Sequence, residues 1–187
     1  MKKKVMLLSC VLIFVLLVPA FAASDPFSTF PEALGVQVGR LAGIGLSYQK
    51  WNGDDGYQVA VGAMYHPLMN DGHDILNYNI GFEYMRSMYS DDFAKWLSGR
   101  LYIFAGINHR GYKETVVNPV SYDYEAGDFH LEFGAGGGIG VEAVFFEHFA
   151  IATEMAYVLY YSPLELALQD RFILDLIPQV SVRYRFN

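Results

Sequence analysis

Charged residues recur within alternating apolar segments through the second half of this sequence. They are Glu83, Arg100, Glu142, Glu154, Arg183 and Arg185. Acids and bases at similar depth on neighbouring strands could form a proton or ion path. The alternative is a salt-bridged plug, because the interior of a small barrel is just wide enough for its own side chains. This narrowness favours the plug, so we expect the six residues to form a charge network that fills a lumen.

The elements that would position these residues are strands. From Phe172 to Phe186, large apolar residues fill alternate positions with mostly polar residues between them. Such a period of two is typical of a strand with one apolar and one polar face. The same pattern predicts strands at 34–39, 43–51, 57–65, 76–84, 96–109, 129–145, 149–161 and 172–186. The even count predicts an all-β fold, an eight-stranded antiparallel up-and-down transmembrane β-barrel after an N-terminal signal peptide.

Connection lengths predict how this barrel sits in a membrane. Bacterial membrane barrels have short periplasmic turns and longer outer loops. The sequence predicts short turns at 52–56, 88–95 and 146–148, and its longest loops at 66–75, 111–128 and 162–171. Aromatic residues gather at membrane interfaces. We expect an interfacial aromatic girdle that includes Trp51, Trp96, Phe145 and Phe149.

The beginning of the sequence predicts export. Lys2, Lys3 and Lys4 precede an uncharged apolar run from Val5 to Val18, and Ala20-Phe21-Ala22 follows. This arrangement is typical of a secretory signal peptide. The apolar run is shorter than the roughly 20 residues that a spanning helix needs. We expect residues 1–22 to be a cleaved signal peptide, 23–33 a short periplasmic N-terminal tail and 34–187 the outer-membrane β-barrel.

Composition excludes several classes of function. The sequence has one cysteine, Cys10, which lies in the predicted signal peptide, so we expect no disulfide or thiol site in the mature chain. A formal net charge of −7 disfavours nucleic-acid binding through a basic surface. Fourteen Tyr, fourteen Phe and eighteen Gly suit lipid-facing aromatic belts and a crowded lumen.

Several short motifs carry a resemblance to a known family. They are Gly-Val-Gln-Val-Gly at 35–39, Gly-Ile-Gly-Leu-Ser-Tyr at 43–48, the glycine-rich segment 129–145 and the closing Val-Arg-Tyr-Arg-Phe at 182–186. With the strand pattern, the chain resembles the small eight-stranded outer-membrane β-barrel proteins of the OmpA/OmpX-like class, most of all the short outer membrane protein beta-barrel domain proteins. The resemblance implies an outer-membrane location. It also implies an assembly signal at Val182, Tyr184 and Phe186, where the family commonly ends on the aromatic residue. Here Asn187 follows.

Catalytic and cofactor sites are not expected. Some barrels of this size are lipid A acyl enzymes, which need a Ser, a His and an acid within reach, but His130 is followed by Leu131 and Glu132. The stretch 138–143 matches the dinucleotide pattern Gly-x-Gly-x-x-Ala, yet it lies within a predicted strand and not at a strand-to-helix turn. A metal site at His66, His73 and Asp74 is a weaker alternative, because such loop pairs are common.

The sequence thus predicts an exported membrane barrel with a structural or surface-interaction role. The expected partners are outer-membrane lipids, the barrel-assembly machinery that recognises the C-terminal strand, and an extracellular partner at the acidic, tyrosine-rich 111–128 loop. A narrow pore and a lipid-modifying enzyme are alternatives. A soluble periplasmic ligand-binding barrel is a rival of another class, but it would enclose more large apolar groups than a small tube can hold.

Overall fold

The computed structural model describes residues 26–67, 74–117, 124–164 and 171–187. A short helix precedes a run of strands: α2 (Pro26–Thr29), β1 (Glu32–Val38), β2 (Gly45–Asn52), β3 (Asp55–Pro67), β4 (Asp74–Ala94), β5 (Leu97–Val117), β6 (Tyr124–Phe145), β7 (Phe149–Tyr161) and β8 (Phe172–Phe186). The predicted signal peptide, 1–22, lies outside the described residues. Within them, no helix is long and apolar enough to cross a membrane.

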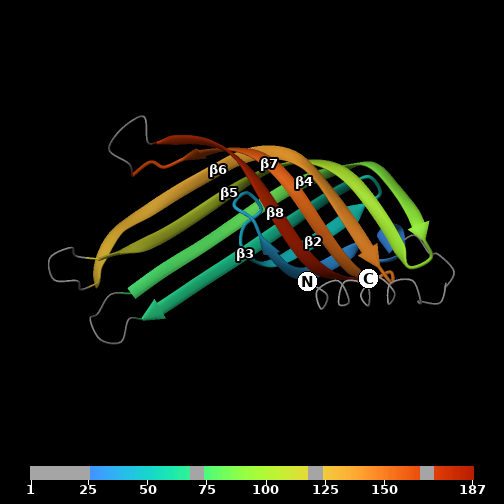
Figure 1. The fold of residues 1–187 in the computed structure, drawn as a ribbon, viewed down its shortest axis with the longest axis horizontal. Helices are drawn as coiled ribbons and strands as arrows, with labels where there is room; N and C mark the ends of the chain where they lie inside the picture. The colour runs from blue at the N-terminus through green and yellow to red at the C-terminus, as the bar shows by residue number, and fades with distance from the viewer. Residues whose placement is uncertain (1–25, 68–73, 118–123, 165–170) are drawn as a thin grey trace, which may run out of the picture.

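The strands form a closed barrel in which each one pairs with its sequence neighbours and β8 pairs with β1 (Figure 1). Every pairing is antiparallel, and the ring closes through partners such as Leu34 and Tyr184. The predicted all-β, eight-stranded, up-and-down fold is therefore confirmed. Over the length of β1 and β2, closure removes the exposed sheet edges that would otherwise pair with other chains.

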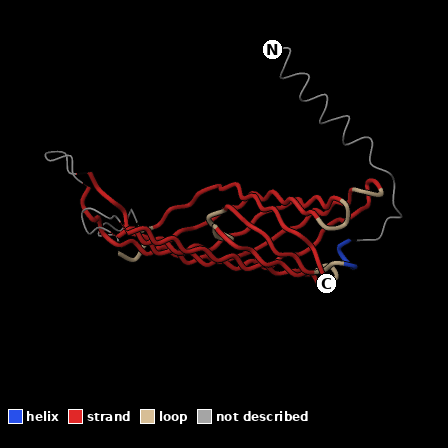
Figure 2. The backbone as a smooth tube through the Cα atoms, turned by 90° about the horizontal axis from the view of Figure 1, so that it is seen from below, coloured by secondary structure: helices blue, strands red, loops and turns tan. Residues whose placement is uncertain are grey.

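The two ends of the barrel differ. We call the end that joins β2 to β3, β4 to β5 and β6 to β7 the turn end, and the opposite end the loop end. Helix α2 lies at the turn end beside the C-terminus (Figure 2). The strands are also unequal: β1 has 7 residues and β2 has 8, whereas β4, β5 and β6 have 21 to 22. The β1–β2 hairpin therefore stops well short of the loop end.

Alternation along the strands separates an outer apolar face from an inner polar one. In β7 every second residue is exposed and the residues between are buried, from Phe149 to Tyr161. The exposed set includes Ile151, Met155 and Leu159, and the buried set includes Ala152 and Glu154. This is the polarity that a membrane barrel needs and the inverse of that of a water-soluble one.

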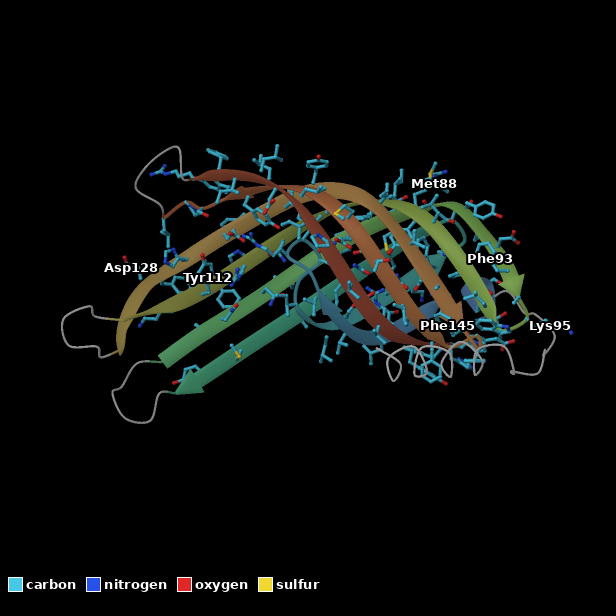
Figure 3. The ribbon with its side chains drawn as sticks, viewed as in Figure 1. Met88, Phe93, Lys95, Tyr112, Asp128 and Phe145 are labelled. Carbon is cyan, nitrogen blue, oxygen red and sulfur yellow. The ribbon has the colours of Figure 1, made fainter. Side chains whose placement is uncertain are left out.

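Two predicted connections are wrong. The turn expected at 88–95 is strand, because β4 continues to Ala94 through register shifts at 87/89 and 92/94. Such bulges insert an unpaired residue and interrupt the alternation on which the prediction depended; Met88 points away from the barrel near the turn end (Figure 3). The loop expected at 111–128 is also mostly strand, since β5 reaches Val117 and β6 begins at Tyr124.

The segment predicted as a tail, 23–33, contributes to the barrel. Glu32 and Ala33 pair within β1, and residues 26–29 form α2. Phe27 on this helix is 4% exposed, because it packs beneath the guanidinium groups of Arg100 and Arg185. The boundary at residue 34 is therefore corrected to 32, and the described residues before it cover the turn end.

Candidate functional site in the barrel interior

All six charged residues of the predicted lumen network lie in the interior. Glu83, Arg100, Glu142, Glu154, Arg183 and Arg185 are 0–6% exposed. They come from β4, β5, β6, β7 and β8, each from an inward position of its strand. Unpaired buried charges are costly, so what matters is how each is satisfied.

Arg183 binds the first three strands to the last one. Its Nε donates to Ser47 Oγ over 3.0 Å and its Nη2 donates to Gln37 Oε1 over 2.7 Å. Nη2 also donates to Gln58 Oε1. One guanidinium on β8 thus contacts β1, β2 and β3, and it fastens the closing strand from inside through charge-assisted hydrogen bonds.

The carboxylates Glu83 and Glu154 are joined by neutral side chains. Gln179 Nε2 donates to Glu83 Oε1 over 2.9 Å and to Glu154 Oε2 over 3.0 Å. Tyr102 OH donates to Glu154 Oε1 over 2.6 Å, and Gln58 Nε2 donates to Glu83 Oε2. The amide groups of Gln58 and Gln179 and the hydroxyl of Tyr102 therefore bind both carboxylates. The order of charges along the strands had suggested direct contacts between acids and bases instead.

A direct ion pair lies nearer the turn end. Arg185 Nη1 is 3.1 Å from Glu142 Oε1, and both side chains are fully buried. Arg185 Nε also donates to the main-chain oxygen of Phe30 over 3.0 Å. Arg100 is held differently: its guanidinium carbon lies 4.1 Å from the ring centroid of Phe27 and 4.2 Å from that of Trp51. Stacked cations and rings close this end of the interior.

Trp51 does not belong to an outer aromatic girdle, and that prediction is wrong. The side chain is 2% exposed and packs edge-on against Tyr102, with centroids 5.6 Å apart. It shares the inward phase of Ser47 and Gln49, which are also buried. The period of two along β2 indicates an inward position for Trp51. The prediction of an outward position relied instead on the general preference of Trp for membrane interfaces.

The other predicted surface residues lie on the outer face. Trp96 stacks on Phe145, and exposed Phe149 packs edge-on against Tyr184. Both pairs are at the turn end, where Figure 3 labels Phe145. Val182 and Tyr184 of the predicted assembly signal are half-exposed, whereas Phe186 is partly covered.

The β1–β2 connection, 39–44, closes the interior on the loop-end side of the network. It folds inward, so that Leu41 and Ala42 are fully buried. Gln179 Oε1 accepts hydrogen bonds from the main-chain nitrogens of Leu41 and Ala42, over 3.0 and 2.8 Å. Gly43 and Gly45 have φ values of 106° and 139°, which side chains disfavour. The sequence predicts a short connection here, but not its inward path.

A second ion pair lies above this connection. Arg40 Nη2 is 2.7 Å from Glu132 Oε2, and the Arg40 guanidinium lies 4.2 Å from the ring centroid of Tyr160. Sequence reasoning missed this pair because Arg40 lies between strands. Glu132 could have been predicted as a member of the pair, because it is an acid at an inward position of β6.

No group of three or more His, Cys, Asp or Glu side chains in the described ranges could hold a metal ion. His66, His73 and Asp74 lie outside the residues whose side chains are described. The described histidines stack on rings: His109 on Phe133, His130 on Tyr112 and His148 on Tyr184.

Comparison with family models and with curated proteins finds no significant match. Among solved structures, the chain is similar to the N-terminal β-barrel domain of OprF from Pseudomonas aeruginosa. The TM-score is 0.42 and the identity is 15%, with 83% of this chain and 95% of that chain covered. The strand pairing of the chain itself remains the basis for its fold: a closed antiparallel barrel with a polar, packed interior.

Proposed function

We propose that this chain is a bacterial outer-membrane β-barrel protein with a side-chain-filled lumen and a structural or surface-interaction role. The observation that carries the proposal is the combination of a closed barrel, an outer face of exposed apolar side chains, and an interior of buried charges. A membrane explains both faces at once, because lipid solvates the apolar outside and the closed pairing of the strands keeps most backbone polar groups within the ring.

The apolar outer face argues against a soluble barrel. Large apolar side chains on every strand are roughly half-exposed, and they are contiguous around the ring. Soluble monomers rarely expose continuous apolar patches of more than a few hundred Å². Examples from successive strands are Val36, Leu46, Val61, Phe82, Ile103, Ile139, Met155 and Val182.

The packed interior favours a plugged barrel over a narrow pore. A water-filled path through the lumen would leave the charges of its wall solvated, whereas the six network residues are almost completely buried. The network is covered at both ends: by Phe27 and Trp51 toward the turn end, and by Leu41 toward the loop end. We infer a protein that does not conduct ions in its resting state.

We also infer a non-enzymatic role with partners at the surface. Acyl chemistry would need a histidine aligned with a nucleophile and an acid. The stacking of His109, His130 and His148 on aromatic rings favours a packing role for all three. The proposed partners are outer-membrane lipids, an assembly machinery that reads Val182, Tyr184 and Phe186, and an extracellular molecule that contacts the hairpin of 111–128.

Fractionation and conductance test this proposal. The full chain should be found in the outer-membrane fraction and should migrate faster in detergent gels before heating than after, because a closed hydrogen-bonded ring survives mild detergent. Planar bilayers containing the folded protein should show no sustained conductance. Recovery of the protein as a soluble periplasmic species would disprove the membrane assignment, and large steady currents would disprove the plug.

A further inference from the structure

The short β1–β2 hairpin leaves an opening in the barrel wall. Pairing of β2 with β3 stops at Leu46 and Val61, and pairing of β1 with β8 stops at Val38 and Val180. Beyond these points, 62–67 of β3 and 172–179 of β8 have no strand partner on the facing side in the described structure. Figure 1 shows β3 and β8 continuing toward the loop end past the inward-folded connection. We call this gap the side opening.

The sequence supports the side opening as a built feature. Pro178 stands where β8 loses β1, and proline is confined to strand edges because it has no N–H to donate. On the β3 side of the gap, Asn79 of β4 holds the β1–β2 connection in place through Ile44. Its Oδ1 accepts a hydrogen bond from Ile44 N over 2.7 Å, and its Nδ2 donates one to Ile44 O over 3.0 Å. The carbonyl oxygen of Ile44 lies so close to Gly62 that a Cβ at position 62 would overlap it.

The side opening lies at the depth of the apolar belt. Exposed Tyr65 flanks it on β3, and exposed Phe172, Leu174 and Leu176 flank it on β8. In a bilayer, unpaired strand edges are tolerated only where they line a water-filled cavity or are buried in protein. If the proposed membrane location holds, the opening must therefore lead from the bilayer into a hydrated space.

A cavity of about 280 Å³ lies on the β3 side of this opening, lined by residues of the β1–β2 connection, β3, β4 and β5. Its lining is polar on the side of the tall strands, with Asn77, Asn79, Asn108 and Arg110, and Arg40 belongs to its rim. Asn108 is 6% exposed, yet its Nδ2 has no acceptor among the described residues. An acceptor in the cavity, from a ligand or from water, would satisfy this donor.

Arg110 favours an anion in the cavity, because the acid opposite it already pairs with Arg40. Arg40 and Arg110 provide two guanidinium groups, and Glu132, the β6 partner of Arg110, already pairs with Arg40. Arg110 lies 4.2 Å from the ring centroid of Tyr112. Arg40 is also influenced by the negative charge of Asp175 on β8, so Arg110 is the guanidinium better placed to bind an anion. Arginine binds phosphate through paired N–H groups.

We propose that this cavity binds the phosphate headgroup of a glycerol-type anionic lipid, whose acyl chains leave through the side opening into the bilayer. The proposal rests on the membrane location proposed above. A volume near the lower limit for small-molecule pockets holds a headgroup and not a whole lipid. The chains must then lie outside, where Tyr65 and Leu174 offer apolar contacts.

Lipid titration by native mass spectrometry tests the headgroup site. The folded protein is transferred to maltoside micelles and titrated with dioleoylphosphatidylglycerol, dioleoylphosphatidylcholine or glycerol 3-phosphate. Phosphatidylglycerol should bind about tenfold more tightly than phosphatidylcholine, and Arg110→Gln should remove about that factor. Arg86→Gln, an exposed arginine beside Asp55 at the turn end, is the matched control and should leave affinity unchanged.

Labelling tests the side opening. In a Cys10→Ser background, Met64→Cys, which lines the cavity at 58% exposure, is modified with a bulky maleimide. This adduct should abolish binding of phosphatidylglycerol, whereas the same adduct at Ile139→Cys, 59% exposed on β6, should not. Equal binding of glycerol 3-phosphate and the lipid, or equal effects of both adducts, would overturn the proposal. Heat-dependent migration of every variant separates these results from failure of the membrane assignment.

Discussion

The Nε of Arg185 donates a hydrogen bond to the carbonyl oxygen of Phe30 over 3.0 Å. This contact ties the last strand to the segment that precedes the first one, so the ring is closed by more than the pairing of β1 with β8. Phe27, on the helix just before Phe30, packs beneath Arg185 and Arg100.

Removal of the Phe27 ring should therefore destabilise the barrel. Phe27→Ala empties a fully enclosed position and should lower the free energy of unfolding by about 3 to 5 kcal/mol. Urea unfolding of the refolded protein in micelles measures this loss. Phe93→Ala, at a side chain that is well exposed on β4, is the control and should cost much less. Equal losses would mean that α2 does not support the ring.

Glu142→Gln should strand the guanidinium of Arg185 in the interior. Loss of one partner from a fully buried pair typically costs about 3 to 5 kcal/mol. Adding Arg185→Met should recover part of the loss, because the unpaired charge is then absent although the hydrogen bond to Phe30 is lost with it. The same unfolding assay applies, with Glu32→Gln as a surface control whose pair with Lys50 is partly exposed and worth about 1 kcal/mol or less. A double variant as unstable as Glu142→Gln would argue against the pair.

Charge on the outer face should be penalised according to depth. Ile107→Arg places a cation in the middle of β5, opposite Phe82, and should cost about 2 to 4 kcal/mol, whereas Met88→Arg near the turn end should cost about 0 to 1 kcal/mol. Both side chains are exposed outward. Unfolding from lipid vesicles gives the two values. If the order were reversed, the apolar belt would not be where the alternation puts it.

A methyl group at position 140 should disturb the network. A Cβ on Gly140 would overlap the ring of Tyr102, whose hydroxyl donates to Glu154. Gly140→Ala should cost about 1 to 3 kcal/mol by overpacking. In a Tyr102→Ala background the same change should cost less, and the coupling energy of this cycle measures the contact. Additive costs would mean that the two residues do not touch.

The hairpin of 111–128 should tolerate loss of its tip. Replacement of residues 118–123 by Asn-Gly keeps the paired strands to Val117 and from Tyr124, and a two-residue turn of this type suits a hairpin. Heat-dependent migration should persist, while any surface adhesion conferred by the protein should be lost. A scrambled 118–123 of equal length is the control. Adhesion that survives both changes would exclude this tip as the contact.

Some elements follow directly from the sequence and others do not. The bounds of β7 and β8 agree with the predicted ranges, because uninterrupted alternation leaves no freedom in phase. In β4 the bulge near Met88 shifts the phase, and the polar residues beyond it suggest a turn that the chain does not make. At position 51 the alternation of the strand places Trp51 inward, against the general preference of Trp for membrane interfaces.

The interior was predictable in its charges but not in its contacts. Inward phase identifies Glu83, Glu154 and Arg183, yet the side chains that join them come from distant strands, as Gln179 and Gln58 do. The place of Phe27 could not be predicted, because four helical residues show no periodicity and their burial is purely tertiary. The inward path of 39–44 depends on Gln179 and Asn79, which are far away in the sequence.

The pairing of β1 with β8 also sets the order of events during biogenesis. The first strand, seven residues long, finds its second partner only when the final strand has been made. Contacts that span the whole chain form slowly, because loop closure must precede them. Without β8, the outer edges of β1 and β7 have no strand partner, and such unpaired edges are prone to pair with other chains. A chain truncated before β8 should therefore be more prone to aggregate than the full chain.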